Sequence, residues 1–227
     1  MKKLAAIALI FVFGIAAAHA LRLPSASGIV DSARTAITNK QIFSVISDTW
    51  VYQFKPDKNY GDGKGWADIT DPTNPVTLPK MFLGFGGTDK KTVLLKFDIS
   101  GMDRSKQISS ARVLLYNDYA GSDAAILVDA KMLTGTWEEK SVTYNSCPGT
   151  DGKVLSTTRM KGAIGYRDPS RWYAYDVTDA VKAWQAGTPN NGIMLDPQGE
   201  YGVDFDIVAK EYTQKAAYAP KLEVTYK

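Results

Sequence analysis

Aromatic and cationic residues stand close together in two stretches of this 227-residue chain. Aromatic rings stack on the apolar faces of sugar rings, and cationic side chains donate directional hydrogen bonds to hydroxyls and attract acid groups. Both stretches are therefore candidate carbohydrate-binding surfaces, provided that the fold leaves their rings exposed. The residues concerned are Tyr60, Lys64 and Trp66 in a glycine-rich stretch, and Arg167, Arg171 and Trp172 in GYRDPSRWYAY. The alternative for any tryptophan is burial in a core, which we expect for Trp50, Trp137 and Trp184.

Oxygen-bearing side chains from several segments form a second candidate site. Calcium takes six to eight oxygen ligands, and segments that meet at one edge of a β-sandwich can supply them. The candidates for such a structural calcium ion are Asp48, Asn59, Asp62 and Glu211. Their spacing matches no EF-hand loop, so the alternative is a set of solvated acids and turn formers. The sequence indicates no other cofactor.

The chain begins with a stretch typical of an export signal. Lys2 and Lys3 precede an apolar run over residues 4–17, and Ala18-His19-Ala20 is a small-x-small cleavage site. We expect residues 1–20 to be removed and the remaining chain to be secreted to the extracellular space or the periplasm. The apolar run is too short for an ordinary membrane span.

Loss of that segment removes the single histidine of the chain, His19. Without histidine there is no Ser-His-Asp triad, no Cys-His pair and no His-ligated zinc site. Glu138 and Glu139, read as strand neighbours, point to opposite faces and do not form the carboxylate pair of a glycosidase. We therefore expect no enzyme; a polysaccharide lyase that uses tyrosine and a cation stays as the less favoured alternative.

The charge and cysteine content limit the partners further. The formal charge of the whole chain is +3, and it falls towards neutrality when Lys2 and Lys3 leave. This balance argues against a nucleic-acid surface, which normally carries a basic patch. Cys147 is the only cysteine, so no disulfide forms within the chain, and we expect this thiol to be buried or half-buried.

The elements that would position these residues are mostly short strands. Apolar residues alternate in 91–98, 110–117, 204–211 and 221–226, and 80–86, 124–133 and 192–196 are less regular candidates. Glycine, proline, asparagine and aspartate fill the gaps between them. The pattern predicts an all-β fold, a two-sheet antiparallel jelly-roll-like β-sandwich over residues 42–227, preceded by an N-terminal arm or linker at 21–41.

One stretch has helical spacing instead. Val177, Val181 and Trp184 share a helix face, Asp176 stands where an N-cap belongs, and Gly187 supplies a stop. A helix of about residues 177–186 is marginal alone, so we expect its apolar stripe to cap the core of the sandwich.

Six motifs in sequence order carry a resemblance to the DNRLRE (disaggregatase-related) modules. They are DTWVYQFKPDKNYG, LLKFDIS, ISSARVLLY, TWEEKSVTYNSCP, YAYDVTDAVKAWQAGTPNNGIML, and AKEY followed by APKLEVTY. The resemblance covers roughly residues 47–227, with Tyr144 where the family often has tryptophan and Ala209 where it often has serine.

The resemblance implies a secreted, non-catalytic jelly-roll-like domain that binds carbohydrate, some relatives being modules for acidic or structural polysaccharides, or that adheres to cell-surface or matrix components. The alternative is a structural matrix or fibre subunit that self-associates by adding its 21–41 arm to a neighbour's sheet.

Overall fold

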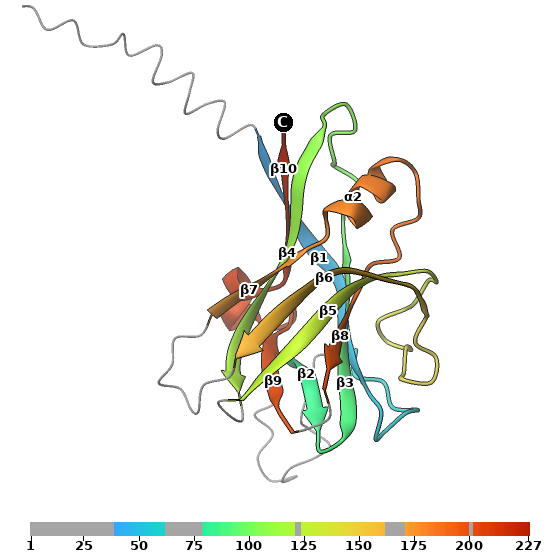
Figure 1. Ribbon diagram of the computed structural model, residues 1–227, viewed down its shortest axis with the longest axis vertical. Coiled ribbons are helices and arrows are strands. Elements are labelled where there is room, and N and C mark those ends of the chain that lie inside the picture. The colour runs from blue at the N-terminus through green and yellow to red at the C-terminus, as the bar shows by residue number, and fades with distance from the viewer. Residues whose placement is uncertain (1–38, 62–78, 121–123, 162–170, 200–201) are drawn as a thin grey trace, which may run out of the picture. The chain divides into compact units, whose positions relative to one another are not determined.

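A computed structural model describes residues 39–61, 79–120, 124–161, 171–199 and 202–227 (Figure 1). The predicted export signal and most of the predicted arm lie outside these residues. So do four predicted site residues, Asp62, Lys64, Trp66 and Arg167. No helix in the described ranges is long and apolar enough to cross a membrane.

The regular secondary structure of the described residues consists almost entirely of strands. These are β1 (Lys40–Tyr52), β2 (Lys80–Gly86), β3 (Asp89–Phe97), β4 (Ile108–Ala120), β5 (Ala125–Leu133), β6 (Thr150–Lys161), β7 (Arg171–Asp176), β8 (Ile193–Gln198), β9 (Asp204–Val208) and β10 (Lys221–Tyr226). Two helical segments interrupt them, α2 (Thr178–Gln185) and the 3₁₀ segment η1 (Thr213–Tyr218).

All strand pairs are antiparallel, and β1 belongs to two of them. Its first residues pair with β10, and after an irregularity between Val45 and Ser47 the strand pairs with β3. One layer therefore runs β1-β3-β8-β5-β6. The other runs β1-β10-β4-β7, and β4 continues beyond β10 to pair with β9, which pairs with β2. The sheet folds over itself around one core, which confirms the predicted all-β antiparallel sandwich.

The predicted alternation sets which side chains enter this core. Val93, Leu95 and Phe97 of β3 are buried, as are Leu222 and Val224 of β10. Side chains that alternate along a strand point to opposite faces, so the residues between them lie on the other face of the sheet. That face is partly covered too, because Leu94 of β3 is buried there in a second apolar cluster with Val51 and Trp137. The core tryptophans are also as expected, since Trp50, Trp137 and Trp184 are all buried.

Helix α2 closes one end of the sandwich, where it packs against β4 and β6 (Figure 1). Val177, Val181 and Trp184 are fully buried, which confirms the predicted apolar stripe. The predicted N-cap is wrong by one residue. The cap position is Val177, while the Asp176 carboxylate accepts a hydrogen bond from the Thr178 amide, 2.9 Å away, from one residue further out. Gly187 has φ +109°, the left-handed stop that was expected.

Strand β6 and segment η1 are among the elements that the sequence patterns did not mark. Strand β6 is polar and largely exposed because among the described strands it pairs only with β5, so it lacks the alternation that marks a half-buried strand. Segment η1 has no buried residue. It nevertheless carries Tyr218, an exposed aromatic residue that belongs to the candidate site described below.

Candidate functional site

Three aromatic rings cluster on the outer face of the layer that contains β4 and β7. Tyr116 of β4 lies directly opposite Trp172 of β7 in the strand ladder, and their rings are 5.3 Å apart in an edge-to-face arrangement. Tyr218, at the end of η1, lies 4.2 Å from the Tyr116 ring and 6.2 Å from Trp172. Trp172 and Tyr218 are 37% and 39% exposed, which leaves ring surface open to a ligand. We call Tyr116, Trp172 and Tyr218 the aromatic platform.

Cations border the aromatic platform. The Lys221 ammonium, at the start of β10, lies 4.2 Å from the centre of the Trp172 ring, a cation–π distance. Further along the same face Arg112 and Lys40 both pair with Glu223, at 2.5 and 2.6 Å. These neighbours give the face a positive character beside its rings, the combination that suits a ligand carrying both apolar ring faces and acid groups.

The predicted pairing of Arg171 with Trp172 is not what the strand produces. The two residues are neighbours on β7, and neighbours on a strand start towards opposite faces. Trp172 faces outwards with Ala174, whereas Arg171 shares its side of the strand with the buried Tyr173. Lys221, from a different strand, takes the place beside the tryptophan that the sequence suggested for Arg171.

Tyr60 is a core residue and offers no stacking face. Its side chain is only 3% exposed, and its ring stacks on Trp50 with centroids 3.9 Å apart. The prediction that Tyr60 binds a ligand directly is therefore wrong, because the tyrosine folds back onto β1.

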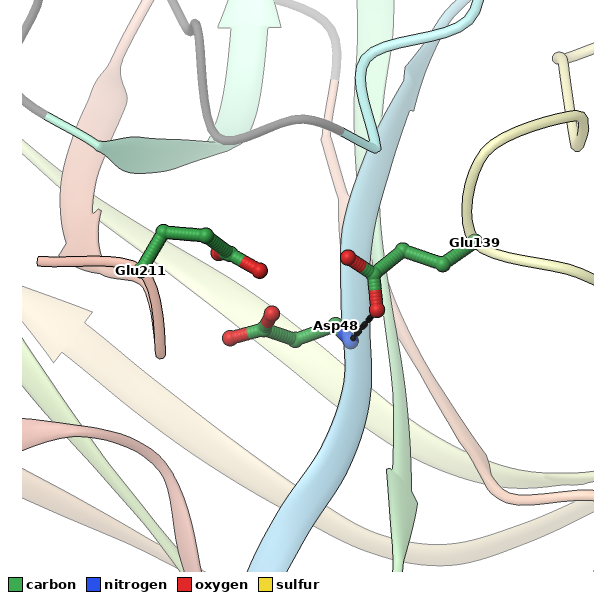
Figure 2. Close-up of side chains that lie close together, drawn as sticks. All are labelled: Asp48, Glu139 and Glu211. Carbon is green, nitrogen blue, oxygen red and sulfur yellow. Dashed lines mark hydrogen bonds between the residues drawn. The ribbon is translucent and has the colours of Figure 1, made fainter.

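Three carboxylates converge at a second place, near the middle of β1. Figure 2 shows Asp48 of β1, Glu139 from the segment between β5 and β6, and Glu211 from the turn before η1 pointing towards one another. One oxygen from each lies within 4.8 Å of the others. We call these three residues the carboxylate triad. The Lys210 ammonium lies among them, 2.5 Å from Glu139 and 3.4 Å from Asp48, and also pairs with Glu211.

Charge is crowded in the carboxylate triad. Asp48 is 2% exposed, and burial together with the Coulombic effect of Glu211 raises its pKa to about 7, against the lowering effect of Lys210. Burial also raises the pKa of Glu139, while Lys210 acts in the opposite direction. Within the described part of the chain, one ammonium thus pairs with all three carboxylates.

Asn59 was a predicted metal ligand and has a different role. Its amide nitrogen donates to the carbonyl oxygens of Glu139 at 2.8 Å and Val142 at 2.7 Å, and its side-chain oxygen accepts from the Gly61 amide at 3.1 Å. Both polar atoms of its side chain are hydrogen-bonded to backbone groups, so the side chain does not reach into the carboxylate triad. It holds in place the segment that carries Glu139.

Glu139 was overlooked because it was read as a strand residue. It lies in a turn between β5 and β6, where the two-residue alternation does not apply. Tyr116, Tyr218 and Lys221 were also missed as site residues. The sequence indicated only that Tyr116 faces away from the core side of its strand and that residues 221–226 alternate. Neither pattern reveals that three distant segments meet on one face.

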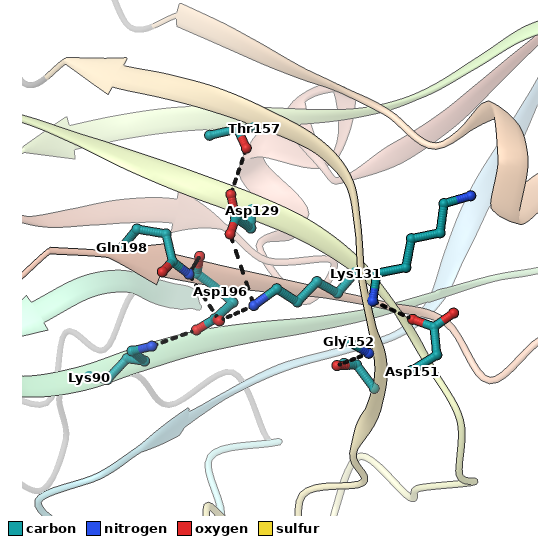
Figure 3. A network of polar contacts seen from close by, with 10 residues as sticks. Lys90, Asp129, Lys131, Asp151, Gly152, Thr157, Asp196 and Gln198 are labelled. Atoms are coloured by element: carbon teal, nitrogen blue, oxygen red, sulfur yellow. Dashed lines mark hydrogen bonds and ion pairs between the residues drawn. The ribbon is translucent and has the colours of Figure 1, made fainter.

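A groove of about 290 Å³ opens on the opposite layer, lined among others by Tyr144, Cys147, Met194 and Asp196. Beside it a network of ion pairs ties the strands together (Figure 3). Asp196 lies 2.8 Å from Lys90 and 2.7 Å from Lys131. Burial alone would raise the pKa of Asp196, but hydrogen bonds and charges from both lysines outweigh it and lower the pKa. Because these charges neutralise one another, we read the network as structural.

Comparison with known proteins gives a family and distant relatives. Residues 39–226 match the sequence model of carbohydrate-binding module family 96. Over 198 residues, 81% of the chain, it is 28% identical to the tRNA nuclease WapA of Bacillus subtilis (strain 168) and 30% identical to the tRNA3(Ser)-specific nuclease WapA of Bacillus spizizenii. The chain spans only 7% of the length of these curated relatives.

Proposed function

The chain belongs to carbohydrate-binding module family 96, and from this premise we propose that it is a secreted, non-catalytic module that binds an acidic polysaccharide on its aromatic platform. The observation that carries the proposal is the grouping of Trp172, Tyr218 and Lys221 on one exposed face. The predicted export signal supports the secreted location.

The mechanism follows from the geometry of that face. Trp172 and Tyr218 are inclined to each other by 30°, so their exposed faces can contact neighbouring sugar rings. Lys221 then donates charge-assisted hydrogen bonds to an acid group beside the stacked ring. The Arg112 guanidinium, whose side chain is 49% exposed, can add a second such contact further along the sheet.

The test is affinity electrophoresis of the purified protein in gels that contain polygalacturonate, alginate or a neutral cellulose derivative. We expect retention in the uronate gels, and a loss of about tenfold in affinity, or about 1.4 kcal/mol, for Trp172→Ala and Tyr218→Ala. Lys221→Gln should weaken binding and reduce its sensitivity to salt, since exposed charges are screened. Phe54→Ala is the control, because Phe54 is 64% exposed but does not belong to the platform.

Two results would contradict the proposal. Unchanged retention of the Trp172 and Tyr218 variants would remove the site, and absence of retention on every polysaccharide would remove the function. The same samples test the lyase alternative, since release of unsaturated sugar ends from the polymers would show catalysis. An RNA-containing gel belongs in the series because the similar WapA proteins are named as tRNA nucleases, and preferential retention there would overturn the carbohydrate assignment.

A further inference from the structure

The carboxylate triad of Asp48, Glu139 and Glu211 has the geometry of a cation site. Calcium–oxygen distances are about 2.3–2.6 Å, so two ligands on opposite sides of one ion are about 5 Å apart. One oxygen from each of the three carboxylates lies within 4.8 Å of the other two, which fits within a single coordination sphere.

Backbone groups hold two of the carboxylates with one oxygen turned inwards. The Lys210 amide donates to Asp48 Oδ2 at 2.8 Å, and the Asp48 amide donates to Glu139 Oε2 at 3.3 Å (Figure 2). The other oxygen of each carboxylate, Asp48 Oδ1 and Glu139 Oε1, is left to face the common centre. The ligands are therefore positioned before any ion arrives, which lowers the entropy lost on binding.

Two buried oxygens at this centre lack hydrogen bonds. Among the described residues, no donor hydrogen-bonds to Asp48 Oδ1 or to Glu211 Oε2, although both atoms are inaccessible to solvent. The Asp48 side chain is fully buried, and among the described residues its ion-pair partner is the Lys210 ammonium, 3.4 Å from Oδ1. Leaving a buried charged oxygen without a hydrogen bond is costly, so these atoms point to a missing partner.

Lys210 does not supply enough charge to fill that role. Its single positive charge faces three carboxylates, and its side chain is 24% exposed. The ammonium can therefore move outwards to solvent without breaking the Lys210 amide contact to Asp48. A divalent cation would then neutralise more of the cluster than the ammonium does.

We propose that Asp48, Glu139 and Glu211 bind a calcium ion, in competition with the Lys210 ammonium for the same oxygens. Calcium fits better than magnesium because the ligands come from three separate segments of irregular geometry, whereas magnesium demands near-ideal octahedral ligands at about 2.0–2.1 Å. The ion would join β1, the turn with Glu139, and the segment that leads through Glu211 into η1. This ligand set differs from the one predicted from the sequence. Glu139 is added as a ligand, and Asn59 binds the backbone of Glu139 instead of the ion.

The first test is a calcium titration of the EDTA-treated protein in which binding is measured by calorimetry. Thermal unfolding of the same protein is then measured with and without calcium. We expect one calcium bound per chain, a rise in melting temperature with calcium, and a clearly smaller response to magnesium. Glu211→Gln should raise the calcium Kd by about tenfold or more. Glu138→Gln is the matched control, since it removes an exposed carboxylate next to Glu139 and should leave the Kd unchanged.

Lys210→Met separates the proposal from a purely structural ion-pair cluster. If lysine and calcium compete, this variant binds calcium more tightly than the wild type, and calcium restores its stability. If Lys210 is the permanent counter-ion, the variant is destabilised and calcium does not rescue it, which overturns the proposal. A wild-type protein whose melting temperature and heat of titration do not respond to calcium overturns it as well. Asp48→Asn is avoided as the main variant because Asp48 is fully buried.

Discussion

The side-chain nitrogen of Asn59 lies 2.8 Å from the carbonyl oxygen of Glu139, a residue 80 positions later in the chain. The same nitrogen also donates to Val142. Tyr60 next to it stacks on Trp50, and the Gly61 backbone lies against the Glu139 carbonyl. The Asn-Tyr-Gly sequence, residues 59–61, thus acts as a clamp that fixes the turn after β5 against β1. That turn carries Glu139.

Gly61→Ala should destabilise the protein through this clamp. A β-carbon at position 61 would lie 1.7 Å from the Glu139 carbonyl oxygen, which is backbone and cannot rotate away. We expect a loss of about 1–3 kcal/mol in the free energy of unfolding, the usual cost of overpacking. Urea denaturation measures it. Gly149→Ala is the control, since the nearest atom to a β-carbon there is 4.0 Å away, and an equal effect of both substitutions would contradict the clamp.

Trp184→Ala tests the role of helix α2 as the closure of the core. The Trp184 side chain is 1% exposed, and its removal leaves a large cavity beneath the helix. We expect a loss of about 3–5 kcal/mol, as for other buried tryptophans. Trp172→Ala, on the exposed face, should cost far less stability, while it weakens the proposed polysaccharide binding by about tenfold. A small effect of Trp184→Ala in thermal or urea unfolding would mean that the helix contributes little to the core.

The sequence predicted the fold well because the core is encoded locally. Val93, Leu95 and Phe97 alternate on one strand, and Val177, Val181 and Trp184 recur at helical spacing, so each pattern is visible within a few residues. The polar edge strand β6 has no such pattern. The candidate sites were only partly predicted, because they depend on contacts between distant segments.

Trp172 and Glu211 illustrate that limit. Each was recognised by its residue type, but their partners Tyr218 and Glu139 come from other parts of the chain. Tyr60 illustrates the opposite error, since an aromatic residue next to a glycine-rich stretch is equally able to fold inwards. Residue type indicates the chemistry that a site can perform, whereas exposure and partners follow from strand register and turn geometry.

Acid should weaken the ion-pair network around Asp196. Its pKa is lower in the folded protein than in an unfolded chain, so the network stabilises the fold above the unfolded value of about 4. That stabilisation is lost as the pH falls through the folded pKa. At pH 7 Asp196→Asn should cost on the order of 1–3 kcal/mol, because it removes the negative charge between two lysines and one of the two oxygens that accept their hydrogen bonds. The difference from the wild type should shrink as the pH is lowered towards 3 in urea unfolding experiments, and a constant difference would contradict this role.

The thiol of Cys147 should react slowly with thiol reagents in the folded protein. Burial, with a smaller effect from Asp196, raises its pKa to about 11, and its sulfur lies 3.7 Å from the Pro148 carbonyl oxygen. The thiolate is the reactive form, and at pH 8 its fraction is more than about a hundredfold smaller than for an ordinary thiol of pKa about 8.5. Reaction with a disulfide reagent such as DTNB should therefore be slowed by about that factor, and urea should restore the normal rate.

The pH dependence of that reaction separates the raised pKa from simple shielding of Cys147 within the groove. If the pKa is raised, the rate keeps increasing in proportion to hydroxide concentration up to about pH 10, because the thiolate fraction is still growing. A shielded thiol with an ordinary pKa would react slowly but reach a plateau near pH 9. Asp196→Asn should increase the rate modestly, since it removes the second cause of the shift. A plateau near pH 9 in the folded protein would show that access, and not ionisation, limits the reaction.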